Sequence, residues 1–402
     1  CIRPVIGALF TLVTGCETSK SASGHNISSL YIIDKADKID VQYYISQITS
    51  SRVRVRWTIS NSSIEAESDE FGEEMANLVF SYKIFQNYST SISIDSGRLI
   101  LKDFHVFEDT PLKGQIEFDL ESSRNHLIEI TLRDLNAVKY DRQYLNLIKS
   151  KQFSNQSFEV FSSKETLQIN QYVTSADSYL IKTAQPQSNV YARFYDRDFP
   201  IASPPFAVVN PKQFDFKPDK FFQLRKVNSS EFKLYLTQKG FYQIVVDSAS
   251  KQGGSLYYFG DHYPNAKTVN DLLMPLRYIT TQEEFAGMSG LDNIKKNIDA
   301  YWLRVGGGPE RARQLLQAYY LRVETANRLF SSYLEGWKSD RGMCLIVFGP
   351  PTAVYRSTAS ETWFYGEKGK FNTVQLSFTK VVNPFSSNDF RLNRNGALKS
   401  PW

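Results

Sequence analysis

The sequence is poor in the residues that build metal centres and disulfide frameworks. Its 402 residues include only three cysteines and four histidines, too few for a His-rich zinc site or a disulfide-stapled fold. Net charge is also small, because 47 basic and 42 acidic residues leave only +5. A dedicated nucleic-acid-binding protein carries a stronger basic excess. We therefore expect no metal, no cofactor and no nucleic-acid partner.

Aromatic residues, by contrast, are abundant. The chain is 42% hydrophobic and 22% charged, with 28 Phe and 23 Tyr, which is a globular composition and excludes a polytopic membrane protein, a coiled coil or a wholly disordered chain. Aromatic side chains fit the half-buried surface of a sheet, so this composition favours strands. The length allows two to four domains.

The first residues resemble a bacterial lipoprotein signal. An apolar run over residues 4–13 is too short to span a bilayer, which takes about 20 apolar residues. It leads into Leu12-Val13-Thr14-Gly15-Cys16, which is similar to a lipobox, where the cysteine is diacylated and becomes the first mature residue. The sequence predicts a signal peptide over residues 1–15, lipidation at Cys16 and a Ser-rich flexible tether over residues 16–26. A buried strand with an incidental cysteine is the alternative. Lipidation would anchor the chain to a membrane.

Strict alternation predicts strands in the first third of the chain. Residues 52–59 place four apolar side chains on one face and three arginines on the other, the pattern of a half-buried strand. We interpret the arginine face as solvated, with a basic binding stripe as the alternative. Similar runs separated by turn residues predict an antiparallel β-sandwich over residues 27–137; they are residues 78–85, 99–107, 115–120 and 126–132. Residues 137–151 are expected to cross to the next domain.

A second β-rich domain is predicted over residues 138–262, and it could be a second sandwich. Its alternating runs are residues 158–161, 179–183, 190–195 and 241–246. A proline-rich stretch over residues 200–218 interrupts them, and we expect an ordered loop there because proline cannot join a strand ladder.

The last third changes to a helical period. Residues 291–302 predict one helix, and a second begins with Pro309 at its first position and continues to Gly336. We expect this second helix to pack on the following strands, with a groove-binding role as the alternative. Residues 343–348 then predict a strand, and a turn at 349–351 leads to a returning strand at 361–365. The predicted fold class is therefore mainly β, with one or two antiparallel sandwiches followed by an α+β module over residues 268–402.

The turn between that helix and the following segment carries a recognisable motif. Gly336-Trp337-Lys338-Ser339-Asp340-Arg341-Gly342 resembles the signature of the GWxTD domain of Bacteroidota envelope proteins, with Ser339 in place of the usual Thr. Dispersed similarity at residues 274–279, 319–323 and 383–392 extends the resemblance over roughly 270–395. The resemblance implies no assigned enzymatic activity. The positions that it marks as family motif are Gly336, Trp337, Ser339, Asp340, Arg341, Gly342, Gly349, Pro350 and Trp363.

Most of these motif residues have a structural interpretation. We expect Gly336 to end the helix at positive φ, Gly342 to give a tight entry to the strand, and Trp337 to seal the helix–sheet junction. Asp340 and Arg341 are expected to fix the loop through backbone hydrogen bonds and a charge-assisted pair. A binding surface is the alternative.

The remaining chemistry does not favour an enzyme. We expect Ser339 to make a local bond to the backbone and Cys344 to be a buried apolar residue rather than a nucleophile. A Ser or Cys nucleophile needs a nearby histidine, and only His262 lies near the C-terminal module in sequence. A carboxylate pair for glycoside cleavage stays open, because 42 acidic residues offer many pairs.

We therefore expect a non-catalytic, lipid-anchored envelope protein that docks other proteins, for example in an outer-membrane complex. The alternative is a carbohydrate- or peptidoglycan-binding or -processing protein, which an exposed row of aromatic residues on one sheet face would favour. Surface lipoproteins of Bacteroidota resemble one another in an acidic cluster after the lipidated cysteine. Here Glu17 is offset by Lys20, so we expect the periplasmic face of the outer membrane.

Overall fold

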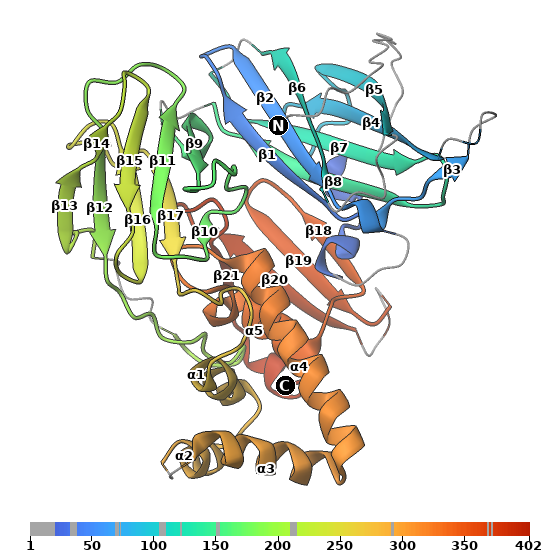
Figure 1. Cartoon of the computed structure of the whole chain (residues 1–402). Coiled ribbons are helices and arrows are strands. Elements are labelled where there is room, and N and C mark those ends of the chain that lie inside the picture. The colour runs from blue at the N-terminus through green and yellow to red at the C-terminus, as the bar shows by residue number, and fades with distance from the viewer. Residues whose placement is uncertain are drawn as a thin grey trace.

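Three bodies make up the fold, in a computed structural model that describes residues 21–32, 38–68, 72, 74–103, 110–120, 123–149, 153–209, 215–290, 293–367, 370 and 373–402. Two β-sandwiches lie side by side, and the sheet of a C-terminal α+β module lies below them in the view of Figure 1. The prediction of a mainly β chain with an α+β C-terminal part is confirmed.

The first sandwich consists of two antiparallel sheets. The smaller has the order β1-β2-β6, and the larger has the order β3-β4-β7-β8, with β5 also paired to β4. Alternation in β2 buries Trp57, which is 2% exposed and stacks on Phe80 of β4 with ring centroids 4.4 Å apart. The elements are β1 (Val41–Gln47), β2 (Arg52–Ile59), η3 (Asn61–Ser63), β3 (Glu67–Ser68), β4 (Glu74–Phe85), β5 (Asp95–Asp103), β6 (Leu112–Asp119), β7 (His126–Asp134) and β8 (Tyr140–Leu147).

The predicted domain boundary at residue 137 is wrong. Residues 137–151 were expected to cross between domains, yet β8 pairs with β7 from Tyr140 to Leu147 and completes the first sandwich. Asp141 is only 2% exposed. A polar residue on the buried face of β8 hides the apolar alternation on which strand prediction depends.

The second β-rich region is also a sandwich. One sheet has the order β10-β17-β16-β12-β13 and the other β14-β15-β11-β9, and Ile181 and Phe232 of the second sheet share a buried core with Phe194 and Ile244 of the first. The described residues of the proline-rich stretch, 200–209 and 215–218, contain no strand. The elements are η4 (Asn155–Ser157), β9 (Phe158–Phe161), β10 (Tyr172–Val173), β11 (Ser178–Thr183), β12 (Tyr191–Tyr195), β13 (Lys220–Gln223), β14 (Arg225–Lys226), β15 (Glu231–Tyr235), β16 (Gly240–Val245) and β17 (Gly254–Tyr258).

The arginine face of β2 forms one side of the interface between the two sandwiches. Arg56 lies 2.5 Å from Glu159 of β9, and Arg54 lies 2.7 Å from Glu117 and 3.7 Å from Glu159. Both arginine side chains are 23% exposed, whereas that of Arg52 is 53% exposed. The prediction of a solvated face is therefore wrong for Arg54 and Arg56. Glu159 of the neighbouring sandwich is the close partner of Arg56, whereas Arg54 pairs mainly with Glu117 of its own sandwich.

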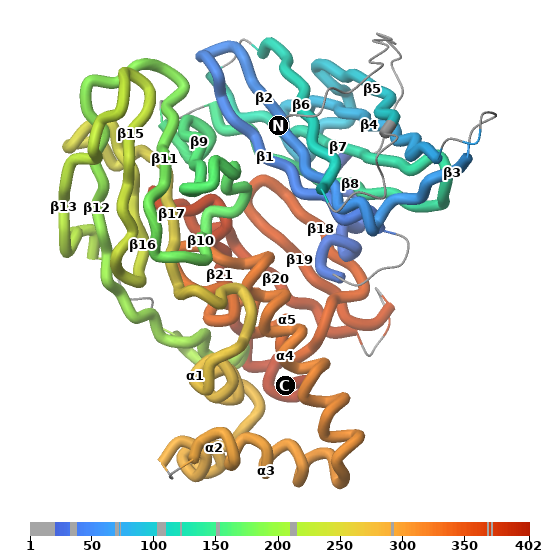
Figure 2. Tube along the Cα trace, in the orientation of Figure 1, coloured from blue at the N-terminus to red at the C-terminus, as the bar shows by residue number. Residues whose placement is uncertain are grey.

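The C-terminal module packs helices on a four-stranded antiparallel sheet of order β18-β19-β20-β21. Figure 2 traces the long helix α4 past this sheet toward the lower helices. Pro309 stands at the start of α4, as predicted, but α4 ends at Phe330, six residues before Gly336. The elements are α1 (Val269–Leu273), η5 (Met274–Tyr278), α2 (Gln282–Ser289), α3 (Ile294–Gly306), α4 (Pro309–Phe330), η6 (Gly336–Lys338), α5 (Asp340–Phe348), β18 (Ala353–Arg356), β19 (Ser360–Tyr365), β20 (Val374–Lys380), β21 (Phe390–Leu392) and η7 (Gly396–Lys399).

The strand predicted at residues 343–348 is wrong, because these residues form the last two turns of helix α5. A short apolar run fits a buried strand and a buried helix equally well by periodicity. Ser339 decides between them, since its hydroxyl caps the helix by accepting the Gly342 N–H at 3.0 Å. Asp340 in the first turn adds a favourable charge at the helix N-terminus. The returning strand expected at 361–365 is confirmed as β19.

The predicted flexible tether is wrong for residues 21–26, which pack against the body as η1 (Ala22–Gly24) and the residues before η2 (Ser28–Tyr31). The Ser23 N–H donates to the Tyr88 carbonyl at 2.8 Å. Asn26 accepts the Val354 N–H at 2.9 Å. Edge strand β18 and the first sandwich thus supply the partners that hold this segment.

The expected signal peptide and Cys16 lie outside the described residues. In the part of the chain described, no helix combines the length and apolar character needed to cross a bilayer.

Candidate functional site

The two glycines of the motif sit where backbones approach closely. Gly336 lies in η6 and lacks the positive φ expected of a helix terminator. A Cβ on Gly336 would meet the Ala326 carbonyl oxygen at 2.0 Å, and one on Gly342 would meet the Gly336 carbonyl oxygen at 2.0 Å. The expected roles at a helix end and a strand entry are therefore wrong. Both glycines instead let η6 pack between α4 and α5.

Trp337 seals the junction between α4 and η5, and its ring is 6% exposed. The Trp337 N–H donates to the Asn327 side chain of α4 at 3.0 Å, and the Trp337 carbonyl accepts the Tyr278 hydroxyl at 3.1 Å. Ser339 makes the expected local bonds, since its hydroxyl also donates to the Gly336 carbonyl at 2.7 Å. These contacts fix η6 relative to α4 and α5.

Asp340 joins the motif to the end of the chain and to the second sandwich. Its carboxylate binds both terminal nitrogens of Arg394, at 2.6 and 3.0 Å, and accepts the Leu392 N–H at 2.7 Å. Arg394 also donates to the Ser203 carbonyl of the proline-rich loop at 2.9 Å. Bidentate charge-assisted bonds of this kind are strong and directional. Asp340 therefore positions a loop that comes from another body, not only its own.

Arg341 is a buried charge, only 2% exposed. Its guanidinium donates to the Asn388 carbonyl at 2.9 Å and lies over the rings of Phe330 and Phe390, with centroid distances of 4.7 and 4.2 Å. One nitrogen lies 3.4 Å from Glu361. Aromatic faces and carboxylate thus replace the water that this charge loses. The expected charge-assisted pair exists, although its partner is Glu361 rather than a residue of the loop.

Glu361 of β19 is the centre of the network and is fully buried. It accepts hydrogen bonds from Tyr31 at 2.6 Å, from Trp363 at 2.6 Å and from Arg356 at 2.7 Å. Burial alone would raise the pKa of Glu361, but the positive charges of Arg356 and Arg341 hold it at about 2. The carboxylate is therefore ionised and pairs the N-terminal segment, through Tyr31, with the C-terminal sheet.

The other motif positions follow α5. Gly349 ends α5 with φ of 80°, a conformation that favours glycine. Arg322 of α4 donates to the Ile346 carbonyl at 3.2 Å and so satisfies the end of the helix. Pro350 is exposed in the turn before β18, and Trp363 is fully buried under α4.

Sequence reasoning missed Glu361, Arg394, Asn388 and Tyr31. Arg356 and Trp363 lie five and two residues from Glu361, but Arg341 lies 20 residues away and Tyr31 lies 330 residues away. No spacing rule therefore connects the whole network. One signal was available in the sequence. Glu361 and Trp363 lie two residues apart and so share one face of their strand, and a carboxylate on a buried face needs a positively charged partner.

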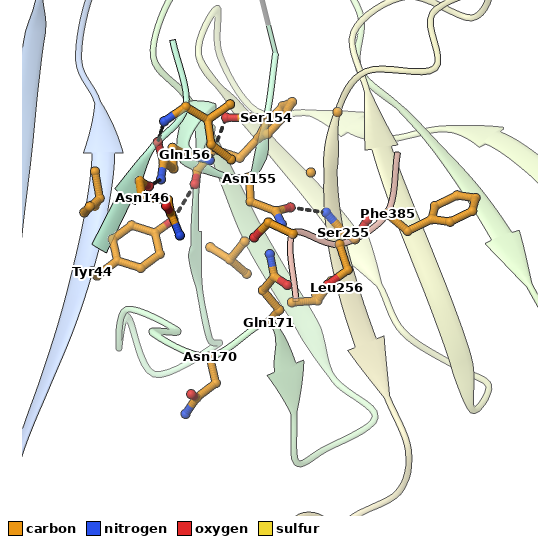
Figure 3. A pocket seen from close by; sticks show the side chains of 18 of the residues that line it. Tyr44, Asn146, Ser154, Asn155, Gln156, Asn170, Gln171, Ser255, Leu256 and Phe385 are labelled. Carbon is orange, nitrogen blue, oxygen red and sulfur yellow. Dashed lines mark hydrogen bonds between the residues drawn. The ribbon is translucent and has the colours of Figure 1, made fainter. Parts of the chain in front are cut away.

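The motif borders a cavity of 550 Å³ that lies between the proline-rich loop and residues 338–340 and 389–396. A second cavity, of 330 Å³, opens where the two sandwiches meet the C-terminal module. Figure 3 shows its amide-rich lining. No group of three or more metal-ligating side chains occurs among the described residues. Burial raises the pKa of the Cys344 thiol well above its usual value, and this cysteine is fully buried.

Exposed aromatic side chains do not line up on a sheet face within the described residues. Tyr140 on β8, Phe216 in the proline-rich loop, Phe221 on β13 and Tyr235 on β15 are 54%, 41%, 46% and 48% exposed. Phe216 and Phe221 border a common cavity, whereas Tyr140 and Tyr235 lie on strands of different sandwiches. The aromatic platform that would favour a carbohydrate-processing protein is therefore not formed by these residues.

Comparison with known proteins assigns the C-terminal part to a family. Residues 240–402 match the family model described as the GWxTD domain. The match includes β16 and β17 of the second sandwich and so begins upstream of the start expected at residue 268. None of the curated proteins compared matches the chain.

Two solved structures have slight similarity to the chain. The BSP domain of a biofilm-associated protein is 7% identical with a TM-score of 0.19, over 55% of this chain and 52% of that one. BcpA, the major pilin subunit of Bacillus cereus, is 9% identical with a TM-score of 0.17, over 51% and 58%. The chain thus spans little more than half of each structure, and neither similarity carries a functional argument.

Proposed function

We propose that this chain, which contains a GWxTD domain over residues 240–402, is a non-catalytic lipoprotein of a Bacteroidota cell envelope. Acylation at Cys16 anchors it to the outer membrane, and its three bodies form a scaffold on which other envelope proteins dock. The lipobox-like sequence before Cys16 supports the anchor. The burial of Trp337, Arg341 and Gly342 supports a structural rather than a catalytic role for the motif.

The observation that carries the proposal is the packing of residues 21–32 against the body of the chain. Ala22 is only 3% exposed, and Tyr31 is bonded into the Glu361 network. Five residues lie between Cys16 and Ala22, so the two positions are at most about 20 Å apart along an extended chain. An acyl chain on Cys16 therefore holds the whole body at the bilayer surface, as suits a scaffold rather than a freely swinging domain.

A strand edge supports the docking function. β13 stands at the edge of its sheet, and Phe221 on β13 is 46% exposed and stacks on Tyr191 with centroids 5.3 Å apart. An edge strand with an exposed aromatic side chain is a template for strand addition by a partner.

Lipidation is tested by metabolic labelling with an alkyne fatty acid. We expect the wild-type chain to be labelled and to sediment with membranes, and Cys16→Ala to lose both properties, because the thiol is the acylation site. Ser19→Ala, three residues away, is the control and should behave as wild type. Membrane retention of an unlabelled Cys16→Ala variant would contradict the anchor.

Docking is tested by cross-linking in native envelopes. The tagged wild-type chain should capture a reproducible set of envelope proteins, and Phe221→Asp should reduce that capture without lowering the midpoint of thermal unfolding. Equal capture by the two chains would remove β13 from the proposal, and no capture at all would contradict the scaffold function.

A further inference from the structure

The cavity of 330 Å³ between the three bodies has an unusual lining. Strands β1 and β8 of the first sandwich, η4 and β17 of the second, and the loop before β21 all contribute to it. None of the described residues that line it is charged, although 22% of the whole chain is. More than half are instead Asn, Gln, Ser or Tyr. A charged ligand would find no opposite charge here to offset its loss of water.

Several polar groups at this cavity have no well-aligned partner among the described residues. Ser255 is 6% exposed, and its hydroxyl lies near that of Tyr257 but forms no well-aligned hydrogen bond. Asn155 uses its carbonyl oxygen to accept the Ser255 N–H at 2.5 Å, which leaves its NH₂ group free to donate. Gln171, the loop residue before β10, points toward these two residues (Figure 3). Its amide offers both a donor and an acceptor.

A buried hydroxyl without a well-aligned partner costs free energy unless something occupies the site. The ligand that fits must present hydroxyl groups, since these both donate and accept and so pair with amide side chains. It must also have apolar faces, because Tyr44 and the partly buried Ile148 and Val160 line the cavity. Neutral sugars combine both properties. The volume lies at the lower end of ligand sites, which span about 300–1,000 Å³.

We propose that this cavity binds a short neutral oligosaccharide, held by hydrogen bonds from Asn155, Gln171 and Ser255. The inference does not depend on acylation of Cys16 or on docking at β13. It also does not require catalysis, because the lining holds no carboxylate that could act as acid or nucleophile.

The test is calorimetric titration of the full chain carrying Cys16→Ala, which removes the lipid. The probes are three neutral hexasaccharides, namely maltohexaose, cellohexaose and hexa-N-acetylchitohexaose. The comparators are the acidic hexamer of galacturonic acid and a capped Ser–Gly hexapeptide. We expect at least one neutral hexasaccharide to bind at millimolar or lower concentration, and both comparators to bind more weakly.

Two variants assign binding to this cavity. Gln171→Ala and Ser255→Ala should each weaken sugar binding about fivefold, the loss expected for one hydrogen bond. Ser255→Ala should leave the midpoint of thermal unfolding unchanged or higher, because it removes a buried hydroxyl that has no well-aligned partner; a merely structural role would lower it. Gln86→Ala, an exposed amide in the loop between β4 and β5, is the matched control and should bind as the parent.

Three results would overturn the inference. They are no binding of any neutral hexasaccharide, tighter binding of the acidic hexamer or the peptide, and equal sugar binding by Gln171→Ala, Ser255→Ala and the parent. Because the anchor is absent from every chain in this test, its outcome is separate from that of fatty-acid labelling.

Discussion

Glu361 concentrates interactions from three parts of the chain on one carboxylate. Tyr31 comes from the N-terminal segment, Arg341 from α5, and Arg356 and Trp363 from the C-terminal sheet. Removing one partner of such a buried pair leaves an uncompensated charge and costs about 3–5 kcal/mol. Arg341 of the motif therefore contributes to stability by neutralising the buried Glu361 carboxylate.

The low pKa of Glu361 predicts loss of stability in acid. The folded chain holds this pKa at about 2, against 4.5 for the free group. The unfolded chain thus takes up a proton first, and the stabilisation is lost as pH falls from about 4.5 toward 2. Its size is of the order of 3 kcal/mol. We expect Glu361→Gln to be less stable at pH 7 and to have a flatter dependence of the unfolding midpoint on pH in this range. An unchanged pH profile would contradict the assignment.

Trp337 predicts a loss of stability rather than a selective loss of binding. Truncating a buried aromatic side chain costs about 3–5 kcal/mol, so Trp337→Ala should lower the midpoint of thermal unfolding by several degrees. Phe221→Ala, which removes an exposed ring, is the control and should change it little. An unchanged melting curve of Trp337→Ala together with lost partner capture would favour a binding surface at the motif.

At the scale of elements, the sequence predicts best where burial and polarity alternate without exception. Strand β2 was predictable because its apolar side chains all face a core. Strand β7 departs from this pattern toward its ends, where His126, Leu127 and Asp134 are also buried. The prediction failed for α5, whose apolar run has no helical or strand period of its own, and for β8, where Asp141 occupies a buried position. The decisive information for α5 is the cap at Ser339, a single residue outside the run.

The cap of α5 can be tested directly. Ser339→Ala removes the acceptor for the Gly342 N–H, and loss of an N-cap costs typically about 1 kcal/mol. Ser339→Thr restores the residue usual in the family motif and keeps the hydroxyl. We therefore expect urea unfolding to show lower stability for Ser339→Ala and near wild-type stability for Ser339→Thr. Equal losses in both variants would mean that the hydroxyl is not the stabilising group.

At the scale of the whole molecule, the contacts between the three bodies could not be predicted from the sequence. Arg56 pairs with Glu159 across 103 residues, and Arg394 contacts Ser203 across 191. Each of these residues is an ordinary charged or polar residue in its own stretch of sequence. Only the packing of three folded bodies brings them together, and the neutral cavity arises at the same junction.

The proposed membrane face rests on the residues that follow Cys16. Glu17 is the only acidic residue between Cys16 and Ala22 and is offset by Lys20, which is why we propose the periplasmic side. Intact cells treated with protease should therefore retain the full-length chain. After the outer membrane is permeabilised, cleavage should occur in the proline-rich loop, where Val208 is 98% exposed. A known surface lipoprotein and a periplasmic protein are the controls. Digestion of this chain in intact cells while the periplasmic control survives would place the body on the cell surface instead.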